Sequence, residues 1–161
     1  MTASSRLRAG TIILGLLTAV VVLAADQGAK RWAMLNLKPG APVTAIPGWL
    51  RFDLTVNSGA SFSVFYGQNR LLTVVGAAVL IAVVALLIIV RGGPALGVGL
   101  GAMIGGAAGN IIDRLRLHAV VDFLRTPLWP ADFNFADVAI RAGALTVVLA
   151  MLLSFRRQPR R

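Results

Sequence analysis

Four stretches of the chain are long and apolar enough to cross a membrane. They cover residues 9–25, 71–90, 95–112 and 138–155. A helix needs roughly 20 apolar residues to span the hydrocarbon core of a bilayer. The pattern therefore predicts four transmembrane helices, with both termini on one side of the membrane.

The first apolar stretch has a second interpretation. It follows Arg6 and Arg8 and ends in two small residues, Ala24 and Ala25, as a cleavable signal peptide does. The apolar stretches downstream favour a retained first helix, because a polytopic membrane protein needs no separate signal.

Between the first two stretches the pattern changes to alternation. Apolar residues stand at positions 50, 52, 54 and 56, with polar residues at 51, 53, 55 and 57. A period of two is typical of a half-buried strand, and Pro39-Gly40 and Pro47-Gly48 indicate turns before it. We expect an extracytoplasmic β-rich platform over about residues 40–66, between helices 1 and 2. The predicted fold is thus a single membrane domain over residues 1–161, all-α apart from this platform.

Glycine recurs every fourth residue in the third apolar stretch, at positions 97, 101, 105 and 109. Small residues at this spacing line one helix face and let a neighbouring helix approach closely. The same spacing continues to Asp113, and Asn110 and Arg114 are likewise four residues apart. The sequence predicts a packed helix whose glycine face leads into a polar cluster.

Composition narrows the possible chemistry. The 161 residues are 57% hydrophobic, include no cysteine and one histidine, and carry a formal charge of +10. The absence of cysteine excludes disulfides, thiol nucleophiles and cysteine metal sites; we predict no metal and no cofactor. The basic residues are scattered and do not form a patch with interleaved aromatics, so we predict membrane lipids as partners and no nucleic acid.

The distribution of basic residues indicates an orientation. Seven Lys and Arg residues crowd into the two terminal flanks and the tight turn at Arg91, whereas the other nine are spread over two long segments. This density favours cytoplasmic termini in a bacterial inner membrane. All six acidic residues are Asp, and in this orientation all lie at the outer side. We therefore expect a site near the extracytoplasmic face.

Two aspartates have strongly apolar surroundings, Asp122 in Val120–Leu124 and Asp137 after Ala136. An ionisable group at membrane depth is a functional hypothesis by default. Asp137 has a structural alternative, a charge that complements the N-terminus of the fourth helix. For Asp122 the alternative is an ion pair with Arg114 or Arg125.

A pair of carboxyls in a poorly hydrated place shares a proton, which makes one group an acid and the other a base. The base takes a proton from water, which attacks a peptide carbonyl, and the acid protonates the leaving amine. The pair predicts amide hydrolysis without a metal or a covalent intermediate.

Other functions fit less well. Ser61 with His118, or Ser58 with Lys30, lacks a recognisable nucleophile context. A small transporter or channel that uses buried Asp residues is the main alternative from another class, but it predicts mid-span acidic residues or repeated halves, and the sequence has neither. A structural scaffold leaves the polar cluster unexplained.

Four sequence blocks resemble the signature blocks of bacterial lipoprotein signal peptidases, the signal peptidase II family of aspartic peptidases. They are Asp26–Lys30, Asn57–Phe62, Gly105–Arg114 continuing to Val120–Phe123, and Phe133–Asp137. Their order and helix context match the family across nearly the whole chain.

This resemblance implies a peptidase that removes signal peptides from prolipoproteins. It implies a substrate whose lipobox Cys carries a diacylglyceryl group, cleavage just before that Cys, and inhibition by globomycin. The family's catalytic aspartates fall on Asp122 and Asp137. The positions implied to bind substrate or support the site are Asp26, Lys30, Asn57, Gly59, Asn110, Asp113, Arg114 and Asn134.

Two positions depart from the family pattern. His118 stands where many members have glycine, and Arg141 adds a cation four residues after Asp137. Arg141 either pairs with Asp137 at helical spacing or extends outward. The assignment of acid and base within the pair depends on which it does.

Overall fold

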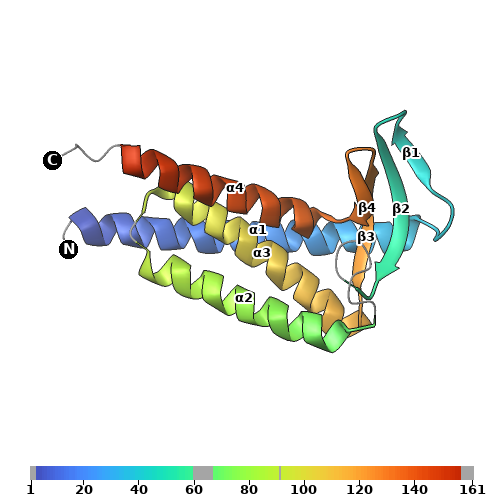
Figure 1. Ribbon diagram of the computed structural model, residues 1–161, viewed down its shortest axis with the longest axis horizontal. Coiled ribbons are helices and arrows are strands. Elements are labelled where there is room, and N and C mark those ends of the chain that lie inside the picture. Colours follow the sequence, from blue (N-terminus) through green and yellow to red (C-terminus); the bar gives the residue numbers. More distant parts are fainter. Residues whose placement is uncertain (1–2, 60–66, 91, 157–161) are drawn as a thin grey trace.

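The computed structural model describes residues 3–59, 67–90 and 92–156. Its helices are α1 (Ala3–Asn36), α2 (Asn69–Ile89), α3 (Pro94–Leu117) and α4 (Phe135–Arg156) (Figure 1). Each contains a segment long and apolar enough to cross a membrane. The predicted class, four membrane helices with a β platform, is confirmed.

The first helix is much longer than the predicted span of residues 9–25. Its 34 residues make it about 51 Å long at 1.5 Å per residue, whereas the hydrocarbon core is about 30 Å thick. Hydropathy falls after Ala25 because Asp26, Lys30 and Arg31 follow. The helix continues past them because the structure satisfies the buried polar groups, as described below.

The platform is a four-stranded antiparallel sheet in the order β1-β2-β3-β4. β1 (Val43–Ile46) and β2 (Leu50–Asn57) come from the predicted region, of which residues 60–66 lie outside the described part. β3 (Val120–Thr126) and β4 (Trp129–Phe133) come from the connection between α3 and α4. No strand was predicted there, because residues 120–123 are all buried and show no alternation.

A small apolar core holds the sheet on the last turns of α1. Ala33 of α1 is buried with Leu54 of β2 and Val121 and Phe123 of β3. Beside them, Trp32 and Phe52 form an edge-to-face pair with ring centroids 5.3 Å apart. The extension of α1 beyond its apolar stretch therefore anchors the sheet.

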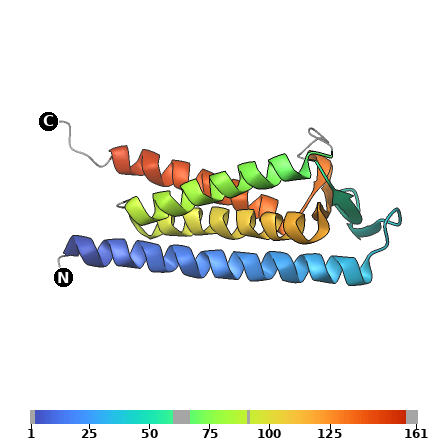
Figure 2. The same cartoon turned by 90° about the horizontal axis from the view of Figure 1, so that it is seen from below.

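α3 is the central helix and contacts the other three. Its glycine face packs on α1 as the spacing predicts: a Cβ added to Gly101 would lie 2.2 Å from the carbonyl oxygen of Gly15. No side chain fits such a contact, so glycine is required there. α1 begins and α4 ends at one end of the bundle, and the sheet lies at the other (Figures 1 and 2).

Candidate active site

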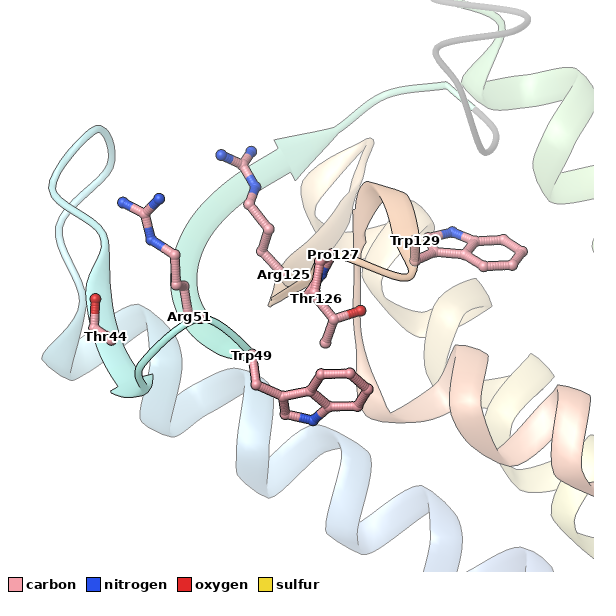
Figure 3. Close-up of a pocket in the computed structure, with 8 residues that line it drawn as sticks. Thr44, Trp49, Arg51, Arg125, Thr126, Pro127 and Trp129 are labelled. Atoms are coloured by element: carbon pink, nitrogen blue, oxygen red, sulfur yellow. The ribbon is translucent and has the colours of Figure 1, made fainter.

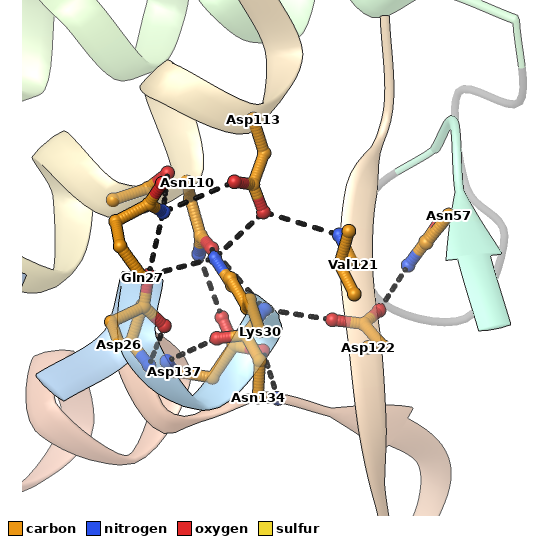
Figure 4. Close-up of polar contacts among 12 residues, drawn as sticks. Asp26, Gln27, Lys30, Asn57, Asn110, Asp113, Val121, Asp122, Asn134 and Asp137 are labelled. Atoms are coloured by element: carbon orange, nitrogen blue, oxygen red, sulfur yellow. Dashed lines mark hydrogen bonds and ion pairs between the residues drawn. The ribbon is translucent and has the colours of Figure 1, made fainter. Parts of the chain in front are cut away.

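A polar network lies where the sheet meets α1, α3 and α4 (Figure 4). β3 carries Asp122 and the first turn of α4 carries Asp137. Asp26 accepts a hydrogen bond from the backbone N–H of Ala136, and Asp113 accepts one from Val121. These bonds bring four of the six aspartates to the sheet end of the bundle.

Asp122 is buried, with 3% of its surface exposed. Its carboxylate accepts hydrogen bonds from two uncharged amides, Asn134 Nδ2 at 2.7 Å and Asn57 Nδ2 at 3.1 Å. The alternative ion pair with Arg125 does not form, because the guanidinium of Arg125 binds Asp53 at 2.8 Å and Asp132 at 2.6 Å.

Asp137 lies in a capping box at the start of α4. The backbone N–H of Asp137 donates to Asn134 Oδ1 at 3.0 Å, and the backbone N–H of Asn134 donates back to Asp137 Oδ2 at 3.3 Å. The other oxygen, Oδ1, accepts a bond from Asn110 Nδ2 at 3.0 Å. The carboxylate therefore does complement the helix N-terminus, and this role also fixes it in the network.

Asn134 links the two carboxyls. It is fully buried, and its amide nitrogen donates to both Asp122 and Asn110 Oδ1, the latter at 3.2 Å. The same side chain holds the backbone N–H of Asp137 through its oxygen. One asparagine thus sets the relative position of Asp122 and Asp137.

A buried cation supports this arrangement. The ammonium of Lys30, 1% exposed, contacts Asp113 at 2.8 Å, Asp26 at 2.9 Å and Asn110 Oδ1 at 2.9 Å. The contact with Asn110 turns its amide nitrogen toward Asp137. Two carboxylates hold the charge of Lys30, so it is poorly suited to serve as a base for Ser58.

Gln27 belongs to the same network and was not predicted as a site residue. Its amide nitrogen donates to Asp113 Oδ1 at 3.1 Å, Asp26 Oδ2 at 3.2 Å and the carbonyl of Gly109 at 3.3 Å. Its position three residues before Lys30 places both on one face of α1, and this spacing is the signal in the sequence that identifies it.

Arg114 ties α3 to the loop that carries Asn57. Its guanidinium donates to the carbonyl of Gly59 at 2.9 Å and to Asn69 Oδ1 at 3.4 Å. The N–H of Gly59 in turn donates to Asn57 Oδ1 at 2.9 Å, which leaves the amide nitrogen of Asn57 for Asp122. The structure thus brings all ten predicted site residues into one connected region.

Burial raises the pKa of Asp122 to about 7, and the nearby charge of Asp137 adds to the rise. The hydrogen bonds from Asn57 and Asn134 act in the opposite direction but are the smaller effect. A carboxyl with such a pKa is still protonated in a large fraction of molecules near neutral pH, and a second carboxyl nearby is what paired acid and base chemistry requires.

The two departures from the family pattern have structural explanations. His118 has φ of 58°, in the left-handed region at the end of α3, where glycine carries no Cβ penalty. Arg141 places its guanidinium carbon 4.0 Å from the centre of the Trp129 ring, so it is held in a cation–π contact beside the sheet.

A cavity of about 590 Å³ lies on the sheet, away from the network, and Trp49, Arg51, Arg125 and Trp129 are among the residues that line it (Figure 3). Within residues 3–59, 67–90 and 92–156, no three His, Cys, Asp or Glu side chains converge to hold a metal ion. Ser61, the other predicted alternative nucleophile, lies outside the described residues.

The four candidate membrane spans define a class, a multi-pass membrane protein, and the comparisons with known proteins narrow it to an aspartic peptidase. A family model described as "Signal peptidase (SPase) II" matches residues 18–153. The lipoprotein signal peptidase of Oleidesulfovibrio alaskensis is 38% identical over 144 residues, 84% of this chain and 92% of that protein. That of Moorella thermoacetica is 37% identical over 148 residues, 90% of this chain and 97% of that protein.

Two solved structures of bacterial membrane enzymes have a similar fold. A structure described as a bacterial membrane enzyme has a TM-score of 0.82 and 27% identity, over 91% of this chain and 93% of that one. A second, with the same description, has a TM-score of 0.77 and 29% identity, over 86% and 92%. The chain belongs to the signal peptidase II family.

Proposed function

We propose that the chain removes signal peptides from prolipoproteins, cutting just before a lipobox Cys that carries a diacylglyceryl group, with Asp122 and Asp137 as the catalytic pair. The observation that carries the proposal is the link through Asn134, which is buried and hydrogen-bonds both carboxyls, that of Asp122 through its side chain and that of the half-buried Asp137 through its backbone N–H. Family membership supports the reaction, and the network supports the residues.

The raised pKa of Asp122 supports Asp122 as the protonated member of the pair and Asp137 as the base. Asp137 takes a proton from water, and the water oxygen bonds to the carbonyl carbon of the scissile peptide. The proton on Asp122 stabilises the developing oxyanion. When the C–N bond breaks, the proton held by Asp137 passes to the leaving amine, and the pair returns to its starting state.

An apolar cavity offers a place for the lipid-soluble parts of the substrate. It has a volume of about 280 Å³ and is lined by α2, α3 and α4, including Val79, Met103 and Ile140. Its polar end is formed by Asn110, which binds Asp137, and by Arg114. We assign it to the acyl chains or the signal helix, because both are apolar and must lie beside the dyad.

The proposed setting is the bacterial inner membrane, with cytoplasmic termini and the sheet and site at the extracytoplasmic face. The supporting observation is that the sheet lies at the end of the bundle opposite the start of α1 (Figure 1), where residues 6 and 8 are arginines, and that the polar network lies beside the sheet (Figure 4). Membrane lipids surround the apolar helices, and a globomycin-type cyclic peptide is the expected inhibitor.

The test is cleavage of a diacylglyceryl-modified prolipoprotein peptide by purified protein in detergent, with the product mass giving the cut site. The same peptide without the diacylglyceryl group is the matched control. We expect cleavage before the modified Cys, at least tenfold faster than for the control peptide, and inhibition by globomycin. Equal rates on both peptides, or a cut elsewhere, would contradict the substrate assignment.

A further inference from the structure

A separate cavity of about 330 Å³ lies between α1 and α3 at the sheet end of the bundle. It is lined by the exposed residues Gly28 and Arg31 of α1 and Arg116 of α3, and by the buried side chains of Lys30 and Asp113. The residues of α3 that line it all follow Gly109, the last residue of the glycine face.

Beyond Gly109 the two helices no longer make backbone contact through glycine. A Cβ at Gly109 would lie 2.3 Å from Asp26, but the next position of the same face is Asp113, whose side chain meets Lys30. On the α1 side nothing lies within 4 Å of a Cβ added to Gly28. Gly28 is itself exposed, so this open space lies at the outer surface of α1, while Gln27 and Lys30 connect the two helices through Asp113.

Two cations at this cavity have no partner. Arg31 and Arg116 are exposed, and neither makes a hydrogen bond or ion pair within residues 3–59, 67–90 and 92–156. Lys30, in contrast, is fully bound by Asp26, Asp113 and Asn110. The free charge of the cavity is positive and is concentrated on two guanidinium groups from different helices.

The surroundings of the cavity are those of a lipid-facing helix surface. Met34 and Leu117 line it and are 47% and 44% exposed. Apolar side chains so exposed on a membrane helix face acyl chains. An occupant of this cavity must therefore combine an anionic group with an apolar body.

We propose that this cavity binds the phosphodiester headgroup of an anionic phospholipid, with Arg31 and Arg116 on the phosphate and the acyl chains along the apolar side chains beside it. Guanidinium groups bind phosphate oxygens in pairs of parallel hydrogen bonds. A zwitterionic headgroup brings its own cation close to both arginines, so an anionic lipid binds more tightly. Arg31 and Arg116 take no part in the hydrogen bonds of the candidate active site, so the test of lipid binding and the test of the proposed function can fail independently.

The proposed lipid site lies against the polar network of the candidate active site. Lys30 and Asp113, which position Asn110 and through it Asp137, form the wall behind the bound headgroup. An anionic lipid bound at this cavity therefore lies directly beside this network.

In the experiment, phosphatidylglycerol is titrated into the full chain, which has been purified in a neutral detergent. Native mass spectrometry counts the lipid molecules bound to each protein. The test variant carries both Arg31→Gln and Arg116→Gln. The control variant carries both Arg51→Gln and Arg70→Gln, and so loses the same charge from exposed arginines elsewhere. Phosphatidylcholine with the same chains, and glycerophosphoglycerol without chains, are the other two probes. Thermal unfolding in lipid-free detergent checks that both double variants fold; if the first does not, each of its single variants replaces it.

We expect phosphatidylglycerol to bind the wild type at least tenfold more tightly than phosphatidylcholine, and the Arg31 and Arg116 pair to lose about tenfold or more of this affinity. The control pair keeps wild-type affinity. Equal losses in both pairs, or no loss in either, would overturn the site. Binding of glycerophosphoglycerol as tight as that of the whole lipid would overturn the lipid assignment in favour of a free phosphate site.

Discussion

Asp122 is expected to lower the stability of the fold at neutral and alkaline pH. Its pKa is raised from 3.8 to about 7 in the folded protein, chiefly by burial. The unfolded chain loses this proton near pH 4 and the folded protein near pH 7, so between these values the folded state binds more protons. The free energy of unfolding therefore falls as pH rises from about 4 to about 7, and this contribution is constant outside that window.

The size of the effect follows from the shift. A rise of about three pKa units corresponds to about 4 kcal/mol at 1.36 kcal/mol per unit. The side chain is only 3% exposed, so solvent screening reduces this value little. Asp122→Asn removes the titration, and its stability relative to the wild type should rise by a few kcal/mol between pH 4 and pH 8.

The assay is thermal or denaturant unfolding in detergent at several pH values for the wild type and Asp122→Asn. The difference between the two curves is the quantity to follow, because any hydrogen bond lost to Asn57 or Asn134 shifts the whole curve equally. Asp137→Asn is a useful second variant, because it removes the charge next to Asp122 but leaves Asp122 buried. The free energy of unfolding should still fall as pH rises, but the fall should end at a lower pH. Parallel wild-type and Asp122→Asn curves from pH 4 to 8 would refute the reasoning.

Three further predictions concern the scaffold. Lys30→Met leaves two buried carboxylates without their cation and should destabilise the fold by about 3–5 kcal/mol in thermal unfolding, whereas Lys38→Met at an exposed position should change little. Gly101→Leu should abolish the monodisperse peak in size-exclusion chromatography, because even a Cβ at position 101 would overlap the backbone of Gly15. Gly10→Ala should keep the peak, because a Cβ at position 10 has open space around it. His118→Gly should be more stable than the wild type by up to about 1 kcal/mol, a rise of roughly 2–4 °C in Tm, because glycine adopts the left-handed conformation of this position without strain. His118→Ala should show no gain, because alanine keeps the Cβ.

The helices could be predicted from the sequence because each carries its own signal. Hydropathy identified all four spans, and the four-residue glycine spacing identified the contact of α3 with α1. The end of α1 could not be predicted in this way, because its last turns are stabilised by Ala33 packing on Val121 and Phe123, which lie far away in the chain.

The sheet shows a second limit. β2 alternates because one of its faces is exposed, whereas residues 120–123 of β3 are buried throughout and carry no period of two. The site residues came from the resemblance to known peptidases and from the apolar surroundings of two aspartates. What the sequence could not supply was the link through Asn134, since hydrogen bonds between residues from α3, β3 and α4 depend on the assembled fold.

The central claim is that Asp122 and Asp137 act as one catalytic unit. The measurement is kcat for cleavage of the diacylglyceryl-modified peptide by Asp122→Asn, by Asp137→Asn and by the double variant. Asp53→Asn is the matched control, since Arg125 keeps its pair with Asp132. The account predicts that each single variant loses about 10³-fold or more, that the double variant loses no more than either, and that the control stays near wild type. Substantial activity in either single variant, or losses that multiply in the double variant, would contradict it.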